Sequence, residues 1–279
     1  MSEADRLAGR TLLARLERQA RKEARLVETL TADFARQLEP VLSGLNRRTR
    51  ALLAELQTKS GRLVATRAAL GRALSLRAQL HAAVKEAGYA DLIRAATDAP
   101  LDDLAAVVLR GRGIIASATR KTPIDIDVLA ALKDIRLADL LQLGDGTADA
   151  LWKSTVDGVL GLRRVEALSD ELAEVVEVTR RQARTLHDTA VSTFSRQVDQ
   201  LGHPAQPEDR FVYVGPLDTE TRPFCRDWLG QVQTRKQLDE ISNGQLPNTL
   251  LTAGGYNCRH KWQWIGSLDA KDLGLSRDG

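Results

Sequence analysis

Two cysteines and one histidine give the C-terminal quarter of this sequence its most distinctive chemistry. Cys258 and His260 lie two residues apart, and Cys225 precedes them in the same block. On a strand, side chains two apart point to the same face, so Cys258 and His260 can reach one ion. Thiolate and imidazole donors suit zinc. Asp218 or His203 can supply a fourth ligand, and the sequence therefore predicts a candidate metal site.

From the residues alone, three interpretations of this cluster stay open. The cysteines can be buried thiols beside a His260 that bonds to the backbone. They can instead hold a structural metal or form a Cys225–Cys258 disulfide. A Cys–His pair can also act as a nucleophile. No orienting group or oxyanion donor can be assigned for that chemistry, although Asn257 is adjacent, and no residue is therefore predicted to be catalytic.

The same block is locally basic and holds three of the four tryptophans. Cationic and aromatic side chains together can form a face that stacks on and neutralises nucleic acid. The alternative, which we favour, is that the tryptophans form a small core and the arginine stems cover it. The residues concerned are Arg222, Arg226, Arg235, Lys236, Arg259, Lys261, Trp228, Trp262 and Trp264.

Composition limits the class of protein. Of 279 residues, 43% are hydrophobic but only 4% are aromatic, so the core must be mostly aliphatic. The net charge of +3 is too small to indicate nucleic-acid binding by itself. No apolar run is long enough to span a membrane, and the N-terminus does not resemble a signal peptide. Two cysteines do not make a disulfide scaffold, which favours synthesis in a reducing cytoplasm.

The elements that position the block are predicted to be mainly α: long helices and helical hairpins, followed by a small α+β module. We expect a helical arm or bundle over 1–164, a long helix and linker over 165–207, and the module over 208–279. The predicted helices offer coiled-coil surfaces for self-association. Apolar residues recur at helical spacing in the first segment and again in the second. They are Val27, Leu30, Phe34, Leu38 and Leu42, then Val165, Leu168, Leu172, Val175, Thr179, Ala183, Leu186, Ala190, Phe194 and Val198.

Proline and glycine set the predicted helix ends. In the first segment we expect a kink or break at Pro40, further breaks at Ser43–Gly44 and Ser60–Gly61, and a C-terminal cap at Gly88. Between 91 and 143 we expect two shorter helices, separated at 98–101. Thr122–Pro123 favours a helix start, and the glycines at 144 and 146 an end.

The module is predicted to contain a strand over 211–214 and a helix capped by Thr234. Further strands are expected at 250–252 and 262–265. The glycines at 254 and 255 between them indicate a positive φ or a close backbone approach.

The amino-acid sequence of the block is similar to that of a known family. Residues 213–230 read YVGPLDTETRPFCRDWLG, and residues 243–262 read NGQLPNTLLTAGGYNCRHKW. Both resemble the C-terminal signature of phage Mu F-like minor head proteins, in the phage head-morphogenesis family. The resemblance extends over about 165–265, and nothing is carried over to the first 160 residues. Besides the candidate ligands, the matching motif positions are Thr221, Arg222, Gly230, Gly254, Gly255, Asn257, Arg259 and Trp262.

The resemblance implies a minor structural protein of a tailed phage or prophage head. Such proteins act in capsid assembly with the portal and capsid proteins, are found in the virion and in the host cytoplasm during assembly, and in some phages enter the host with the DNA. DNA contact is therefore a further expectation. Within the family, cysteine and histidine interchange at the positions of Cys225 and His260, which suits structural zinc better than a disulfide. The alternative is a nuclease or toxin-like hydrolase that uses His260, Asp218, Arg222 and Arg259.

Overall fold

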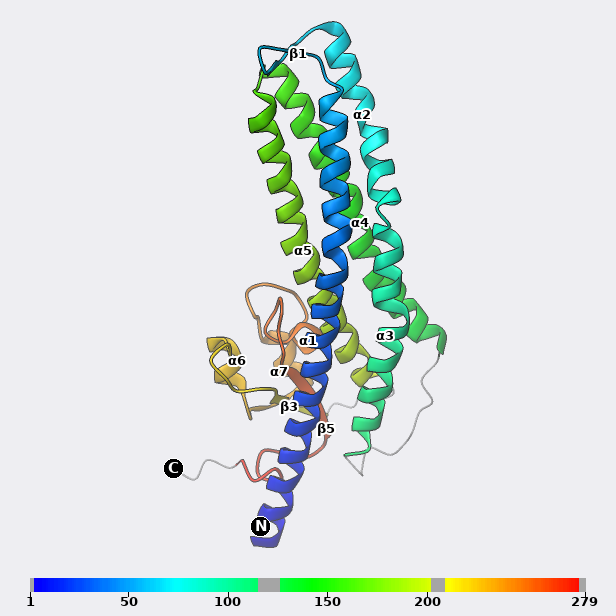
Figure 1. The fold of residues 1–279 in the computed structure, drawn as a ribbon. Helices are drawn as coiled ribbons and strands as arrows, with labels where there is room; N and C mark the ends of the chain where they lie inside the picture. Colours follow the sequence, from blue (N-terminus) through cyan, green and yellow to red (C-terminus); the bar gives the residue numbers. More distant parts are fainter. Residues whose placement is uncertain (1–2, 115–125, 202–208, 276–279) are drawn as a thin grey trace. The chain divides into compact units, whose positions relative to one another are not determined.

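A computed structural model of the chain describes residues 3–114, 126–201 and 209–275. It confirms a mainly α protein with a small α+β region at the C-terminal end (Figure 1). Thr122–Pro123, His203 and most of the predicted linker lie outside the described residues. None of the helices in the described ranges is both long enough and apolar enough for a bilayer crossing.

Five long helices make up most of the chain. They are α1 (Glu3–Ala54), α2 (Arg67–Glu86), α3 (Tyr89–Arg112), α4 (Ile126–Leu160) and α5 (Val165–Gln200). A short antiparallel hairpin, β1 (Thr58–Lys59) and β2 (Arg62–Leu63), joins α1 to α2. Its turn residues Ser60 and Gly61 both have positive φ, which confirms the predicted break there. Gly88, with φ of 78°, ends α2 as expected.

Several predicted helix breaks were wrong. Helix α1 continues through both Pro40 and Ser43–Gly44, and Pro100 lies inside α3. A proline costs an interior helix about 3 kcal/mol, but Leu38 and Leu42 beside Pro40 are fully buried, and tertiary packing of that kind outweighs local propensity. Gly144 lies inside α4, where a side chain would meet the Tyr89 ring at 2.7 Å. Its role is a close approach between helices.

Contacts divide the chain into two compact units, and the division differs from the predicted boundaries. Unit 1 contains Met1–Leu30, Asp98–Arg136 and Asp188–Gly279. Unit 2 contains Thr31–Thr97 and Leu137–His187. Because α1 and α5 each contribute to both units, the start of α1 groups with the C-terminal module rather than with a separate arm.

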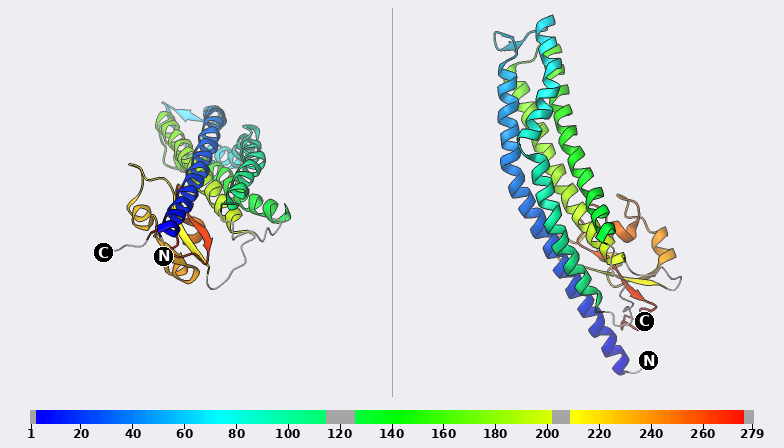
Figure 2. Two further views of the ribbon diagram at one scale, coloured as in Figure 1. Left: turned by 90° about the horizontal axis from the view of Figure 1, so that it is seen from below. Right: turned by 90° about the vertical axis from the view of Figure 1, so that its right-hand side faces the viewer.

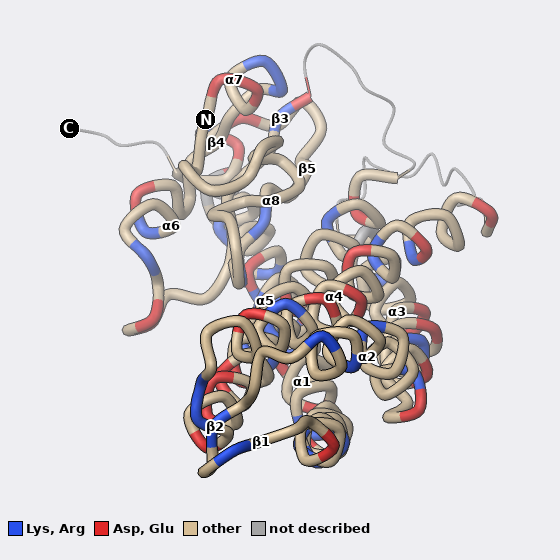
Figure 3. Tube along the Cα trace, turned by 90° about the horizontal axis from the view of Figure 1, so that it is seen from above, with Lys and Arg blue, Asp and Glu red and all other residues tan. Residues whose placement is uncertain are grey.

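Unit 2 is a helical bundle with an aliphatic core. Its helical segments run side by side (Figure 2). Lysines and arginines alternate with acidic residues along the helices, so charges of both signs are mixed (Figure 3). Buried leucines and small residues fill the interior, as the low aromatic content predicts. They include Leu38, Leu42, Leu53, Leu76, Leu80, Ile93, Leu140, Leu151, Leu168 and Leu172.

Unit 1 contains a three-stranded antiparallel sheet in the order β4–β3–β5. The central strand β3 (Arg210–Val214) pairs with β4 (Val232–Thr234) and β5 (Lys261–Gly266). Short helices α6 (Pro223–Trp228), α7 (Arg235–Glu240) and α8 (Thr249–Thr252) complete it. Thr234 caps α7 through a capping box with Gln237, as its position predicted.

The strand expected at 250–252 was wrong, because this segment forms α8. Asn248 enters the left-handed region before it, and the Asn248 carbonyl accepts hydrogen bonds from Leu251 and Thr252. Leu250 is nevertheless buried, so its apolar character correctly indicated a core position. A short apolar run does not distinguish a strand from one helical turn.

The buried histidine of unit 2 supplies a test of this packing. The His187 side chain is fully buried, stacks on Phe34 at 4.2 Å between ring centroids, and has its Nδ1 atom 3.2 Å from the Thr31 hydroxyl. Burial lowers the pKa of His187 to about 4. The folded state therefore resists protonation at a pH where the unfolded chain accepts a proton.

We predict that acidification from about pH 6.5 to about pH 4 lowers the free energy of unfolding by up to about 3 kcal/mol through His187, with no further loss from this group at lower pH. Urea unfolding followed by far-UV circular dichroism measures it. A His187→Gln variant, which cannot titrate, should show a smaller decrease over this interval. An identical decrease in the variant would contradict the assignment to His187.

Candidate metal centre

Three segments of unit 1 bring the cysteines and the histidine together. Cys225 lies on α6, which begins at Pro223 in the first helical position. Cys258 lies in the loop after α8, and His260 directly precedes β5. In this loop Ala253, Gly255 and Asn257 all have positive φ, so the chain turns sharply before Cys258.

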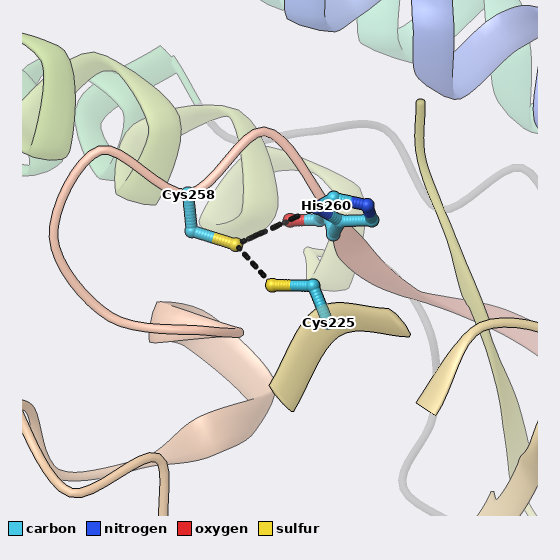
Figure 4. Close-up of side chains that lie close together, drawn as sticks. All are labelled: Cys225, Cys258 and His260. Atoms are coloured by element: carbon cyan, nitrogen blue, oxygen red, sulfur yellow. Dashed lines mark hydrogen bonds between the residues drawn. The ribbon is translucent and has the colours of Figure 1, made fainter. Parts of the chain in front are cut away.

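The three candidate ligands form one buried cluster. The Cys225 and Cys258 sulfurs are 3.7 Å apart, and the Cys258 sulfur is 3.9 Å from His260 Nδ1. All three donor atoms lie within 4.8 Å of one another. The sulfurs face each other and the imidazole (Figure 4). Both thiols are free, so the predicted interpretation as a disulfide does not describe this structure. Among the described residues, this is the one group of its kind.

The hydrogen bonds of His260 identify the nitrogen that can bind a metal. Its Nε2 atom is 2.8 Å from the Pro216 carbonyl oxygen, which can only accept. The proton must therefore be on Nε2, and in the neutral ring the Nδ1 lone pair faces Cys258. A side chain at Gly215 would meet the ring at 2.4 Å, so glycine there makes room for it.

Tyr213 closes another side of the cluster. Its hydroxyl donates to the Cys225 sulfur at 3.4 Å and lies 3.7 Å from the Cys258 sulfur. Its ring is parallel to that of His260, with 5.5 Å between centroids. Burial raises the pKa of Tyr213 well above its usual value, so it stays a phenol that can donate. Sequence reasoning missed this residue, although β3 was predicted.

Cys258 is the more acidic of the two thiols. The Cys225 and Cys258 sulfurs are within hydrogen-bond distance, and the hydrogen bond with Cys225 is the main reason why the pKa of Cys258 is held well below its usual value. His260 and the charge of Arg196 act in the same direction, against the effect of burial. The Gly254 amide also donates to this sulfur at 3.2 Å. Such donors stabilise a thiolate, the form that binds metals.

Asp218 does not lie in the cluster. Both its carboxylate oxygens bind Arg259, at 2.7 and 2.6 Å, and they also accept from the Thr221 hydroxyl and the Glu220 amide. The hydrogen bonds from Arg259 lower the pKa of Asp218 to about 2. Its prediction as a fourth ligand is thus not supported by the geometry. The Asp218–Arg259 pair instead holds the 216–221 turn. The Thr221 hydroxyl is within hydrogen-bond distance of both the Asp218 carboxylate and the Pro216 carbonyl that His260 uses, and its single proton is shared between these two acceptors.

The remaining motif residues serve as supports around the cluster. Arg222 is the N-cap of α6, and Gly230 adopts a positive φ after it. The Asn257 amide donates to the Thr189 hydroxyl at 3.4 Å. Trp262 is buried against Tyr213, with 4.6 Å between ring centroids. These contacts favour the interpretation that the tryptophans form a small core.

A buried charge network lies beside the cluster and was not predicted. Lys261 Nζ is 2.9 Å from a Glu23 oxygen and 3.7 Å from an Asp199 oxygen, and all three side chains are almost fully buried. Burial opposes the charge on Lys261, but the two carboxylates outweigh it and raise its pKa. Lys261 therefore cannot belong to an exposed nucleic-acid face. The alternation of polar and aromatic residues in KWQWI is typical of a strand with an exposed polar face, so it did not indicate this burial.

Arg196 joins α5 to the segment that carries two ligands. Its guanidinium is buried and donates to the carbonyls of Cys258, His260 and Leu251. A cavity of about 20 Å³ borders Arg196, Cys258 and His260. That volume holds about one water molecule. This cavity borders Cys258 and His260 but not Cys225, and it is too small for a substrate.

Gly254 permits the approach of the two sulfurs, since a Cβ there would lie 2.5 Å from the Cys225 sulfur and 3.1 Å from that of Cys258. We predict that Gly254→Ala destabilises the chain by roughly 1–3 kcal/mol through overpacking and speeds the reaction of both thiols with a thiol reagent. Urea unfolding and thiol kinetics measure these effects. Gly71→Ala, in open space on α2, should instead be neutral or stabilise by up to about 1 kcal/mol. Equal effects of both variants would contradict the steric argument.

The buried network predicts a large cost for removing Lys261. Lys261→Met leaves the buried carboxylates of Glu23 and Asp199 without their Lys261 contacts and should lower the free energy of unfolding by about 3–5 kcal/mol. The control is Arg21→Met, which breaks a solvent-accessible pair with Glu17 and should cost less than about 1 kcal/mol. Chemical denaturation measures both changes. A loss for Lys261→Met as small as the control's would disprove the role assigned to the network.

Comparison of the chain with known proteins found no matching family model, no matching curated protein and no matching solved structure. Membership of the head-morphogenesis family therefore stays a prediction that rests on the motif residues.

Proposed function

We propose that this chain is a minor structural protein of a tailed-phage or prophage head, acting in head morphogenesis with the portal and capsid proteins. The proposal rests on how the motif that resembles phage Mu F-like proteins folds. Its residues fold into one α+β region, in which Cys225, Cys258 and Trp262 are core positions. A motif whose members support one another in this way is more informative than the same letters scattered over a surface.

The character of the cluster favours assembly over catalysis. His260 is 3% exposed, its Nε2 atom is committed to Pro216, and the adjoining cavity is water-sized. Arg259, a candidate participant in hydrolysis, is instead paired with Asp218, Glu28 and Glu220. A hydrolase needs its general base within reach of a bound substrate. The nuclease or toxin-like alternative has no comparable support from these residues.

The long helices are consistent with the proposed contacts to portal and capsid proteins. A structural head protein must offer extended surfaces to neighbouring subunits, and α1, α4 and α5 each exceed thirty residues. Basic and acidic residues are interspersed along the described helices (Figure 3), a pattern that suits protein partners better than DNA. We propose portal and capsid contacts as the main interactions, with self-association through helices and DNA contact as secondary ones.

The proposal predicts that the chain is found in virions. Particles produced from the genome that encodes it should, after gradient purification, contain the chain at a constant ratio to the portal protein by quantitative mass spectrometry. Deleting the gene should lower the yield of filled heads, and supplying the gene in trans should restore it. Purified particles that lack the chain, or normal heads from the deletion, would contradict the proposal.

A nuclease assay tests the alternative directly. The purified chain is incubated with DNA and with RNA, next to matched His260→Asn and His81→Asn variants. We expect no cleavage by any of the three. Cleavage that is lost in the His260 variant and kept in the His81 variant would replace the structural proposal with a hydrolase.

A further inference from the structure

We infer that Cys225, Cys258 and His260 bind one structural Zn²⁺ ion, with the Tyr213 hydroxyl closing the fourth side. This inference concerns the chemistry of unit 1 and does not depend on the proposed role in a phage head. It rests on the distances within the cluster, on the fixed tautomer of His260, and on donors that surround the sulfurs.

The distances match a tetrahedral zinc site. Zinc–sulfur bonds of about 2.3 Å place two sulfurs about 3.8 Å apart at the tetrahedral angle, and the two sulfurs here are 3.7 Å apart. The corresponding sulfur–nitrogen separation is about 3.6 Å, against 3.9 Å between Cys258 and His260 Nδ1. The widest donor separation is within 4.8 Å, so a shift of about 1 Å completes the triangle.

The surroundings of His260 are those of a metal ligand. Metal-binding imidazoles usually donate their second N–H to a carbonyl or carboxylate, which fixes the tautomer and the ring orientation. His260 donates to the Pro216 carbonyl, and the ring is held by the parallel Tyr213 ring. A merely buried histidine does not need its free nitrogen to face two thiols.

Among the described side chains, Tyr213 is the best placed for the fourth position. Its oxygen is 3.4 Å from the Cys225 sulfur and 3.7 Å from the Cys258 sulfur, close to the edges of the same tetrahedron. Asp218 is engaged by Arg259 and lies outside the donor group. With Tyr213 in place the site is closed, as structural zinc sites are.

Zinc binding exchanges one Zn²⁺ ion for two protons, so charge and atoms balance. Zn²⁺ replaces the proton of each cysteine thiol, both protons pass to the solvent, and His260 and Tyr213 keep theirs. The ion then joins α6 to the loop after α8 and the start of β5 by coordinate bonds, which are stronger than the thiol contact between Cys225 and Cys258. Because a small module has a limited core, such a link contributes to its folding directly.

The inference predicts about one zinc per chain in protein purified without chelators or added metal, measured by elemental analysis. Chelation in denaturant should release the ion and expose two free thiols. Replacing zinc with Co²⁺ should give the sulfur-to-cobalt charge-transfer bands and the intense visible bands of tetrahedral thiolate coordination. Absence of zinc and of these bands in folded protein, or no free thiols after chelation, would overturn the inference.

Variants locate the ion. Cys225→Ser, Cys258→Ser and His260→Asn should each lose stoichiometric zinc, while His81→Asn, at a partly exposed histidine of unit 2, should retain it. Tyr213→Phe keeps the ring and should lower zinc affinity by about 10–100-fold. Unchanged affinity would remove Tyr213 from the site. A variant that misfolds would lose zinc whether or not its residue is a ligand. The cobalt spectrum is recorded on the unmodified chain and therefore tests the site independently of the variants. Absence of the chain from virions would leave the zinc result unaffected.

Discussion

The hydrogen bond from His260 to the Pro216 carbonyl determines the character of the whole cluster. It places the proton on Nε2 and thereby turns a lone pair toward the two sulfurs. If the ring were reversed, Nδ1 would not face Cys258, and three potential ligands would become two thiols beside an unrelated imidazole. One backbone acceptor thus decides between a simple buried core and a set of converging donors.

That acceptor lies in a turn held by Asp218, which the sequence predicted as a metal ligand, and by two residues predicted as motif positions rather than ligands, Thr221 and Arg259. Asp218 was predicted as a ligand, but its pair with Arg259 fixes the 216–221 turn. Within this turn the Thr221 hydroxyl lies between the Asp218 carboxylate and the Pro216 carbonyl, 3.1 and 3.2 Å away, and its one proton is shared between them. A carboxylate within an exposed turn, such as Asp218, cannot be recognised from spacing alone as a support rather than a ligand, since both roles need the same chemistry.

Much of the fold follows from apolar periodicity, whereas helix ends and tertiary grouping do not. The stripe on α5 was predicted over its whole length because one buried face repeats for many turns. Pro40 and Gly144 misled the prediction, because packing overrides the preference of a single residue and because a glycine can serve close contact instead of a turn. At the site, Cys225, Cys258 and His260 were correctly grouped, while Tyr213 was missed because an aromatic residue in a strand resembles ordinary core.

The buried network around Lys261 explains why the start of α1 belongs to the same unit as the C-terminal module. An isolated lysine could not remain charged in that interior. Glu23 from α1 and Asp199 from α5 must therefore lie beside Lys261. If either helix separated from β5, a charge of this network would lose its buried partner. Removing one partner of such a network is costly even where the network itself adds little net stability. The network therefore specifies which helices pack on β5 more than it strengthens the packing. It lies one residue from His260, so the arrangement that selects these helices also holds the segment on which the donor atoms converge.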